Sequence, residues 1–117
     1  MPRTSKLYLQ DIVECCENAK EYTSGMSFDE FSGDKKTIDA VVRNLEIIGE
    51  AVKNVPNEVL QTQPLLKWKE IARFRDIVVH RYFKVDLEVV WDVVQNRLAE
   101  LKTAVGEMLI EISKQEE

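Results

Sequence analysis

Helical periodicity is the feature of this sequence that most restricts its fold. Apolar residues recur at steps of three and four positions along most of the chain, which is the spacing that lines one face of an α-helix. No alternating apolar pattern bounded by turn residues occurs, so strands are not expected. Three long stripes stand out: Tyr8, Ile12, Cys15, Cys16, Ala19 and Tyr22; Ile38, Val41, Val42, Leu45, Ile48 and Val52; and Trp91, Val94, Leu98, Leu101, Val105, Met108 and Ile112.

The residues that start and stop helices agree with these stripes. The first helix should end near Gly25. Ser27 followed three positions later by Glu30 is typical of a capping box, and it predicts a short turn of helix that Gly33 ends. Asp34 then suits the N-cap position of the second long helix. A short helical turn between two long helices is therefore expected.

The second half of the chain adds two more helices. The second long helix should stop before Pro56, because proline disfavours helical geometry at the preceding Val55. A third long helix is expected to begin near Leu66, and Asp86 is a good cap for the last one. The sequence thus predicts an all-α, up-and-down antiparallel bundle of four long helices plus short helical turns.

Chain length and composition fit a single folding unit. The 117 residues, of which 44% are hydrophobic, suffice for one helical domain that spans residues 1–117. Apolar residues beside the main stripes exceed what one neighbouring helix would cover, which favours a homodimer. These additional residues are Leu7, Leu9, Val13, Val90, Leu109 and Ile110.

The sequence gives no reason to expect a membrane segment, a disulfide, a metal or a cofactor. No apolar run approaches the roughly 20 residues that span a bilayer, and no basic leader opens the chain. Cys15 and Cys16 are adjacent on a predicted helix, where their side chains diverge and cannot form a disulfide without distortion. One histidine and two adjoining cysteines lack the spaced pairs that bind zinc. A cytoplasmic protein is expected.

Charge is distributed unevenly along the chain. The formal net charge of −5 argues against binding of nucleic acid through a broadly positive surface, so any such contact must be local. Residues 67–84 are the exception, since six basic and two acidic side chains give this segment a net charge of +4. The only histidine of the chain, His80, lies within it.

Arg75 is the first candidate site residue. On a regular helix it falls in the middle of the inward apolar stripe that Trp68, Ile71 and Val78 begin to trace. A guanidinium in that position needs an anionic partner, because a buried unpaired charge is costly. The partner is either a glutamate from another helix, which would make the pair structural, or a phosphate group of a substrate.

His80 and Asp76 are the next candidates. His80 lies five residues after Arg75, which on a regular helix separates them by roughly 140° around the axis and about 7.5 Å along it. The two side chains would meet only through a distorted helix, from different sides of a substrate, or across a dimer. Asp76 is four residues before His80, so its carboxylate can reach the imidazole and orient it. The alternative is a solvent-facing or capping histidine.

These residues also resemble a known family. Arg75, His80 and Tyr82 match the Arg-x4-His-x-Tyr signature of HepT toxins, in the HEPN superfamily. Asp76 departs from the family pattern, in which asparagine is common, although either residue can orient a histidine. The resemblance covers nearly the whole chain, through Arg43-Asn44, Ile48-Gly49-Glu50-Ala51, Trp68, Tyr82-Phe83-Lys84-Val85-Asp86 and Val90-Trp91.

The resemblance implies a HEPN-like fold and metal-independent cleavage of RNA. In this chemistry the ribose 2′-hydroxyl attacks the adjacent phosphate, with His80 moving a proton and Arg75 stabilising the phosphate charge. Family members are thought to build a shared cleft in a homodimer. The resemblance further implies a toxin-antitoxin system, in which an MntA-like nucleotidyltransferase antitoxin transfers AMP to Tyr82 and thereby inactivates the toxin.

Two other functions remain open on the residues alone. The chain could be a non-catalytic helical partner that binds a nucleotide or a nucleotidyltransferase, with Arg75 and His80 contacting phosphate only. It could also be a purely structural helical dimer, in which a change of Arg75 would destabilise the fold. For Tyr82 by itself, the alternative is an aromatic core residue.

Overall fold

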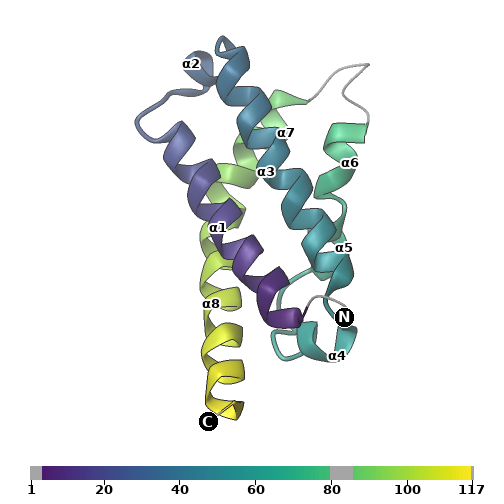
Figure 1. The fold of residues 1–117 in the computed structure, drawn as a ribbon. Coiled ribbons are helices and arrows are strands. Elements are labelled where there is room, and N and C mark those ends of the chain that lie inside the picture. Colours follow the sequence, from purple (N-terminus) through teal and green to yellow (C-terminus); the bar gives the residue numbers. More distant parts are fainter. Residues whose placement is uncertain (1–3, 80–85, 117) are drawn as a thin grey trace.

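The computed structural model describes residues 4–79 and 86–116, without the side chains of residues 77–79. Every element within this part of the chain is a helix (Figure 1). The all-α expectation is therefore confirmed. In chain order the elements are α1 (Ser5–Thr23), α2 (Phe28–Ser32), α3 (Lys35–Asn54), α4 (Asn57–Leu60), α5 (Trp68–Ala72), α6 (Phe74–Val79), α7 (Leu87–Asp92), the π-helical turn η1 (Val93–Arg97) and α8 (Leu98–Gln115).

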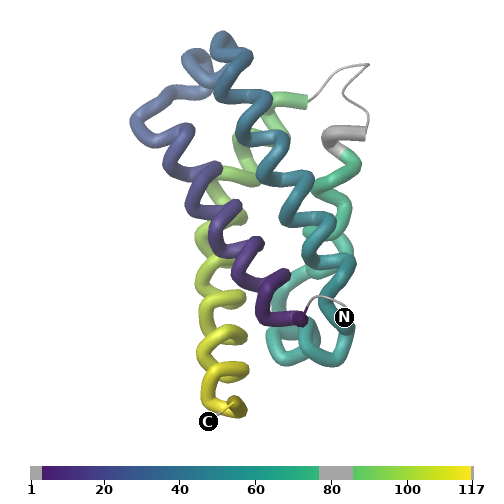
Figure 2. Tube along the Cα trace, viewed as in Figure 1, coloured from purple at the N-terminus to yellow at the C-terminus, as the bar shows by residue number. Residues whose placement is uncertain are grey.

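Three long helices, α1, α3 and α8, form the core. α1 packs along both α3 and α8, and α3 also packs against α5 and α6 on its other side (Figures 1 and 2). The apolar stripes expected from the sequence face this core. The largest fully buried side chains are Leu9, Ile12 and Cys16 on α1, Phe31 on α2, Val41, Leu45 and Ile48 on α3, Val90 on α7, Val94 on η1, and Leu98, Leu101 and Val105 on α8.

Side-chain caps fix the helix boundaries near the expected places. Ser27 and Glu30 form a capping box at the start of α2, as predicted. Asp34 accepts a hydrogen bond of 3.1 Å from the backbone N–H of Thr37 at the start of α3, and this bond lowers the pKa of the Asp34 carboxyl. Asp86 caps α7 in the same way. The first, second and last long helices are thus confirmed.

The expected third long helix is wrong. In its place α5 and α6 are two short helices, separated at Arg73 by a turn that caps α5. Directly after this turn Phe74 is buried, with 6% of its surface exposed. Arg75 therefore lies at the edge of the core and not in the middle of the buried stripe, and 37% of its side chain is exposed.

The last helical run is continuous but contains a π-helical turn. At η1 the backbone N–H of Leu98 bonds to the carbonyl of Val93, five residues earlier. Such turns insert one extra residue and rotate the following side chains relative to the preceding ones. Arg97, the last residue of η1, stands where this turn passes into α8.

The additional apolar residues are partly used within the chain. Leu9 and Val90 are fully buried, whereas Leu7 and Ile110 expose 41% and 58% of their surfaces. The apolar excess that favoured a homodimer is therefore smaller than the sequence indicated. Dimer formation stays a prediction.

Cys15 and Cys16 are free and buried in α1, as expected. Burial raises the pKa of the Cys15 thiol to about 11 and that of the Cys16 thiol to about 12, because the apolar surroundings disfavour the thiolate. None of the helices within the described residues is long and apolar enough to cross a membrane.

Candidate functional site

Arg75 lies in the first turn of α6 and forms an ion pair with a glutamate from another helix. Its Nη1 donates a hydrogen bond of 2.8 Å to Oε2 of Glu50 on α3. Of the two partners considered from the sequence, the structure therefore contains the glutamate. The pair is open to solvent, since 37% of the Arg75 side chain and 53% of the Glu50 side chain are exposed. A ligand can therefore reach the guanidinium without a change in the fold.

Gly49 makes this ion pair possible. A Cβ atom at this position would lie 2.7 Å from the backbone N of Arg75 and 2.8 Å from the carbonyl oxygen of Ala72. Helix α3 and the junction of α5 with α6 are thus in backbone contact, which any larger residue would prevent. The close approach places Glu50, the next residue along α3, beside the Arg75 side chain.

Asp76 supplies a second carboxylate near the guanidinium. Its Oδ1 lies 3.9 Å from Nε of Arg75, and half of its side chain is exposed. Arg75 is thus held between one close carboxylate and one distant carboxylate. His80 and Tyr82 lie outside the described residues, so the pairing of Asp76 with His80 and the role of Tyr82 stay predictions.

The site is less positive than the sequence segment alone indicates. Glu50 enters from α3 and offsets the charge of Arg75, while Lys67 pairs loosely with Glu70 at 3.8 Å. Arg73 is exposed in the turn between α5 and α6. The local excess of positive charge on residues 67–76 is therefore reduced.

A cavity adjoins the Arg75 ion pair on the α1 side. It has a volume of about 210 Å³, lies between α1 and α3, and is lined by Glu50 together with Tyr8, Arg43 and Asn54. Glu50 thus belongs both to the lining of this cavity and to the ion pair with Arg75. A ligand in the cavity would lie next to the ion pair.

Glu50 and Gly49 are the site residues that sequence reasoning did not assign. The position of Gly49 inside an otherwise periodic helix was the available signal, because such a glycine often marks close packing of another backbone. Which residue packs there depends on the tertiary fold. Among the described residues, no group of three or more His, Cys, Asp and Glu side chains could hold a metal ion.

The chain is similar to a family of ribonucleases. The family model described as ribonuclease HepT-like matches residues 12–108. A protein of Thermococcus cleftensis named "Probable ribonuclease HepT" is 47% identical over 102 residues, which cover 87% of this chain and 93% of that protein. No solved structure matches the chain.

Two further relatives align over nearly their whole lengths. A Methanocaldococcus jannaschii protein named "Putative RNase" is 40% identical over 118 residues, covering 100% of this chain and 98% of its own. A protein of Caldanaerobacter subterraneus with the same designation is 41% identical over 107 residues, covering 92% and 96%. With a helical fold, an accessible Arg75 and matches of this extent, the chain belongs to the ribonuclease HepT-like family of the HEPN superfamily.

Proposed function

We propose that the chain is an endoribonuclease that cleaves RNA without a metal ion, by attack of a ribose 2′-hydroxyl on the neighbouring phosphate. The observation that carries the proposal is the accessible guanidinium of Arg75, oriented by Glu50 at the start of the helix that leads toward His80. Such a group binds a phosphate and stabilises the charge that develops on its oxygens.

The reaction needs one proton acceptor and one proton donor. The 2′-oxygen forms a bond to phosphorus and loses its proton to a base, while the bond from phosphorus to the 5′-oxygen breaks and that oxygen takes a proton from an acid. The products are a 2′,3′-cyclic phosphate and a 5′-hydroxyl end. His80, the only histidine, can serve one of these roles per chain. A homodimer would supply two His80 side chains to a shared cleft.

Glu50 acts as a positioning residue in this proposal. An arginine side chain has five N–H donors, and only one of them is used by the bond of 2.8 Å to Glu50. The remaining donors stay available for the phosphate oxygens, and the carboxylate restricts the direction in which they point. Asp76 has the corresponding role for the imidazole of His80.

Regulation by AMP transfer is part of the proposal. A nucleotidyltransferase antitoxin would catalyse attack of the Tyr82 hydroxyl on the α-phosphate of ATP, forming a phosphodiester and releasing pyrophosphate. Tyr82 is seven residues, about two helical turns, after Arg75 in the sequence. On a helix, a nucleotide attached to Tyr82 would place its phosphate near Arg75 and obstruct RNA. The chain would then be the toxin of a toxin-antitoxin pair.

Cleavage of total RNA by the purified chain in EDTA tests the nuclease. We expect the variants Arg75→Ala and His80→Ala to cleave at least about 100-fold more slowly than the unchanged chain. Lys102→Ala is a matched control, because Lys102 forms an ion pair of similar exposure with Glu17 on the opposite part of the fold. Unmodified protein that cleaves no RNA, or an Arg75→Ala variant with full activity, would contradict the proposal.

The ion pair itself favours the second candidate function. The bond to Glu50 gives Arg75 a structural role that needs no catalysis, and its remaining N–H donors could contact the phosphate of a nucleotide or a nucleotidyltransferase without cleavage of RNA. The two functions differ in the RNA assay, where only the nuclease gives ends with a cyclic phosphate. Failure of cleavage together with retained nucleotide binding would favour the binding partner.

The intact mass of the chain tests the regulation separately. Co-expression with its nucleotidyltransferase should increase the mass by about 329 Da for each AMP, mapped to Tyr82. The Tyr82→Phe variant should show no increase and should keep its RNase activity in the presence of the partner. Modification at another residue would refute the role of Tyr82.

A further inference from the structure

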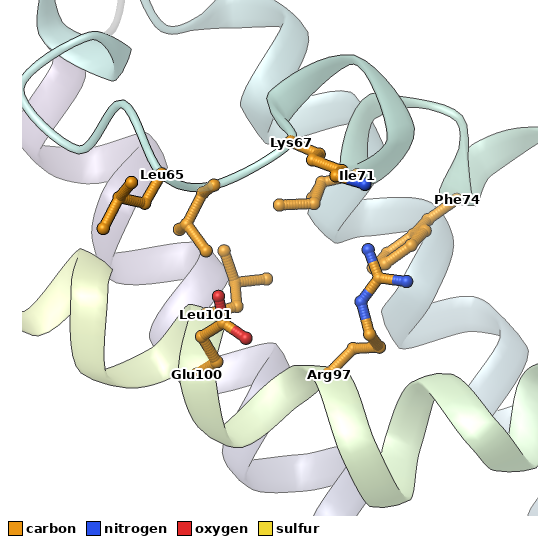
Figure 3. Close-up of a pocket in the computed structure, with 8 residues that line it drawn as sticks. Leu65, Lys67, Ile71, Phe74, Arg97, Glu100 and Leu101 are labelled. Carbon is orange, nitrogen blue, oxygen red and sulfur yellow. The ribbon is translucent and has the colours of Figure 1, made fainter.

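A second pocket lies between α5 and the start of α8, away from the contact of α5 with α3. Figure 3 shows it between the segment that precedes α5 and the start of α8, with Leu65, Lys67 and Phe74 around one side and Arg97 and Glu100 along α8. Its volume is about 200 Å³. Phe74 lines this pocket and directly precedes Arg75 in the sequence, so the pocket lies close to the candidate site along the chain.

Arg97 is the charged group that extends into this pocket. Its side chain rises from α8 toward Phe74 and Ile71 (Figure 3). Arg97 is half-buried, and within the described part of the chain its guanidinium has neither a hydrogen bond nor an ion pair. Glu100 lines the same pocket without forming an ion pair with it. Residues 77–85 contain no acidic side chain that could serve as a partner.

The position of Arg97 is fixed by features that are specific to this part of the fold. The π-helical turn η1 ends at Arg97, and such turns are frequent at functional sites because they redirect side chains. The segment that supplies Leu65, Leu66 and Lys67 on the opposite side is tied to α5 by the indole N–H of Trp68, which donates a hydrogen bond of 3.0 Å to the carbonyl of Gln63. The pocket therefore has two ordered walls and one unpaired cation between them.

The chemistry of the pocket suits an anionic ligand with an apolar part. Lys67 also lines the pocket; its side chain is 76% exposed and pairs only at 3.8 Å with Glu70, so its ammonium can turn toward a bound anion. Phe74, Ile71 and the highly exposed Leu65 supply apolar surface beside the two cations. A partly desolvated guanidinium gains most from a phosphate or carboxylate, which it binds through two parallel hydrogen bonds.

We propose that this pocket is a second phosphate-binding subsite for RNA, in which Arg97 contacts a phosphodiester that flanks the cleaved one. The inference rests on the proposed ribonuclease function. Phe74 lines this pocket and is followed directly by Arg75 in α6, so we place the subsite on the path of the same RNA strand. The subsite would strengthen the binding of longer RNA without taking part in the chemical step.

Binding of a short 2′-O-methyl RNA, which cannot be cleaved through its 2′-oxygen, tests the subsite by fluorescence anisotropy over a range of salt concentrations. We expect Arg97→Ala to weaken binding about tenfold. The slope of log affinity against log salt, which is negative, should become less steep by about one unit, as for the loss of one phosphate contact. Lys102→Ala should change neither quantity, because Lys102 lies in the adjoining helix α8 and its charge is paired with Glu17. Arg97→Lys should keep part of the affinity.

Cleavage kinetics supply the second readout. With long RNA, Arg97→Ala should raise KM and leave kcat unchanged, and with a dinucleotide it should change neither. Unchanged RNA affinity and salt slope in Arg97→Ala would overturn the inference, as would equal losses in Lys102→Ala. If the unchanged chain binds RNA but does not cleave it, the ribonuclease proposal fails, while the binding data still decide the role of Arg97.

Discussion

The long helices and the segment that carries Arg75 differ in what holds them in place. Helices α1, α3 and α8 have 18 to 20 residues each and bury continuous apolar stripes against one another. Helix α5 has five residues and no side-chain cap at its start, and a turn at Arg73 separates it from α6, which is described over Phe74–Val79. Isolated helices of that length are unstable in water. The site segment therefore depends on the core for its shape.

This difference separates stability from function in the molecule. The core needs only side chains of suitable size on the correct face of each helix. The site needs one backbone contact at Gly49 and one ion pair between Glu50 and Arg75. Helix α3 supplies Gly49 and Glu50, and α6 supplies Arg75. Substitutions in the core should thus alter the free energy of unfolding, substitutions in the exposed ion pair should alter activity with little effect on stability, and a substitution at the backbone contact should alter both.

The strongest test of the core is Leu45→Ala. Leu45 is fully buried on α3, so we expect the free energy of unfolding to fall by about 2 to 5 kcal/mol, measured by urea denaturation. Ile110→Ala is the matched control on α8, because 58% of Ile110 is exposed, and its effect should stay within about 0.5 kcal/mol. Equal losses in the two variants would show that the buried stripes do not carry the stability.

Gly49→Ala should affect both regions. The new methyl group would lie within 2.8 Å of backbone atoms of Arg75 and Ala72, so we expect a loss of about 1 to 3 kcal/mol together with a loss of RNase activity. Gly106→Ala is the control, because no atom lies within 4 Å of its added Cβ and alanine favours the helix by roughly 1 kcal/mol. A Gly49→Ala variant that is as stable and active as the unchanged chain would contradict the backbone contact.

Glu50→Gln separates the ion pair from the packing. Since both side chains of the pair are substantially exposed, we expect a stability change of less than about 1 kcal/mol in thermal or urea unfolding. Activity should fall further than stability, because the amide carries no charge to orient Arg75. Retained activity in Glu50→Gln would remove Glu50 from the proposed site, and a large loss of stability would make the pair structural.

The last expected effect concerns pH and the buried cysteines. Folding raises the thiol pKa values from 9.0 to about 11 and about 12, so the contribution of the protonated thiols to stability is fully present below pH 9 and is lost as pH rises from 9 through the folded-state values. Unfolding in urea at neutral pH and above pH 9 should show this loss. It should be reduced in a Cys15→Ala, Cys16→Ala variant, and an identical loss would assign it to other groups.

Much of the core could be predicted from the sequence, whereas the site could only be predicted in part. Asp34, Ser27 and Pro56 fix helix ends through local contacts, which depend on nearby residues alone. The break at Arg73 could not be predicted, because the apolar spacing of Trp68 and Ile71 continues as if the helix were intact. The turn instead accompanies the packing of this segment on α3.

The partner of Arg75 shows the same limit. The position of Arg75 in the apolar stripe predicted that its guanidinium would need an anion. Glu50, however, lies 25 residues earlier and contacts Arg75 only because two helices pack at Gly49. The family signature indicated Arg75 without reference to geometry, and it also indicated His80 and Tyr82, whose positions remain predictions. Arg97 gave no signal in the sequence, since its pocket depends on the π-helical turn.

The buried state of Cys15 and Cys16 has a practical consequence for spectroscopy. With thiol pKa values of about 11 and 12, fewer than roughly one in a thousand of these groups is a thiolate at neutral pH, and both are shielded from reagents. A cysteine introduced at an exposed position, such as Ile110→Cys, would react with a maleimide fluorophore or a nitroxide spin label long before either native thiol. Distances between labelled copies of the chain could then be measured without first removing its own cysteines.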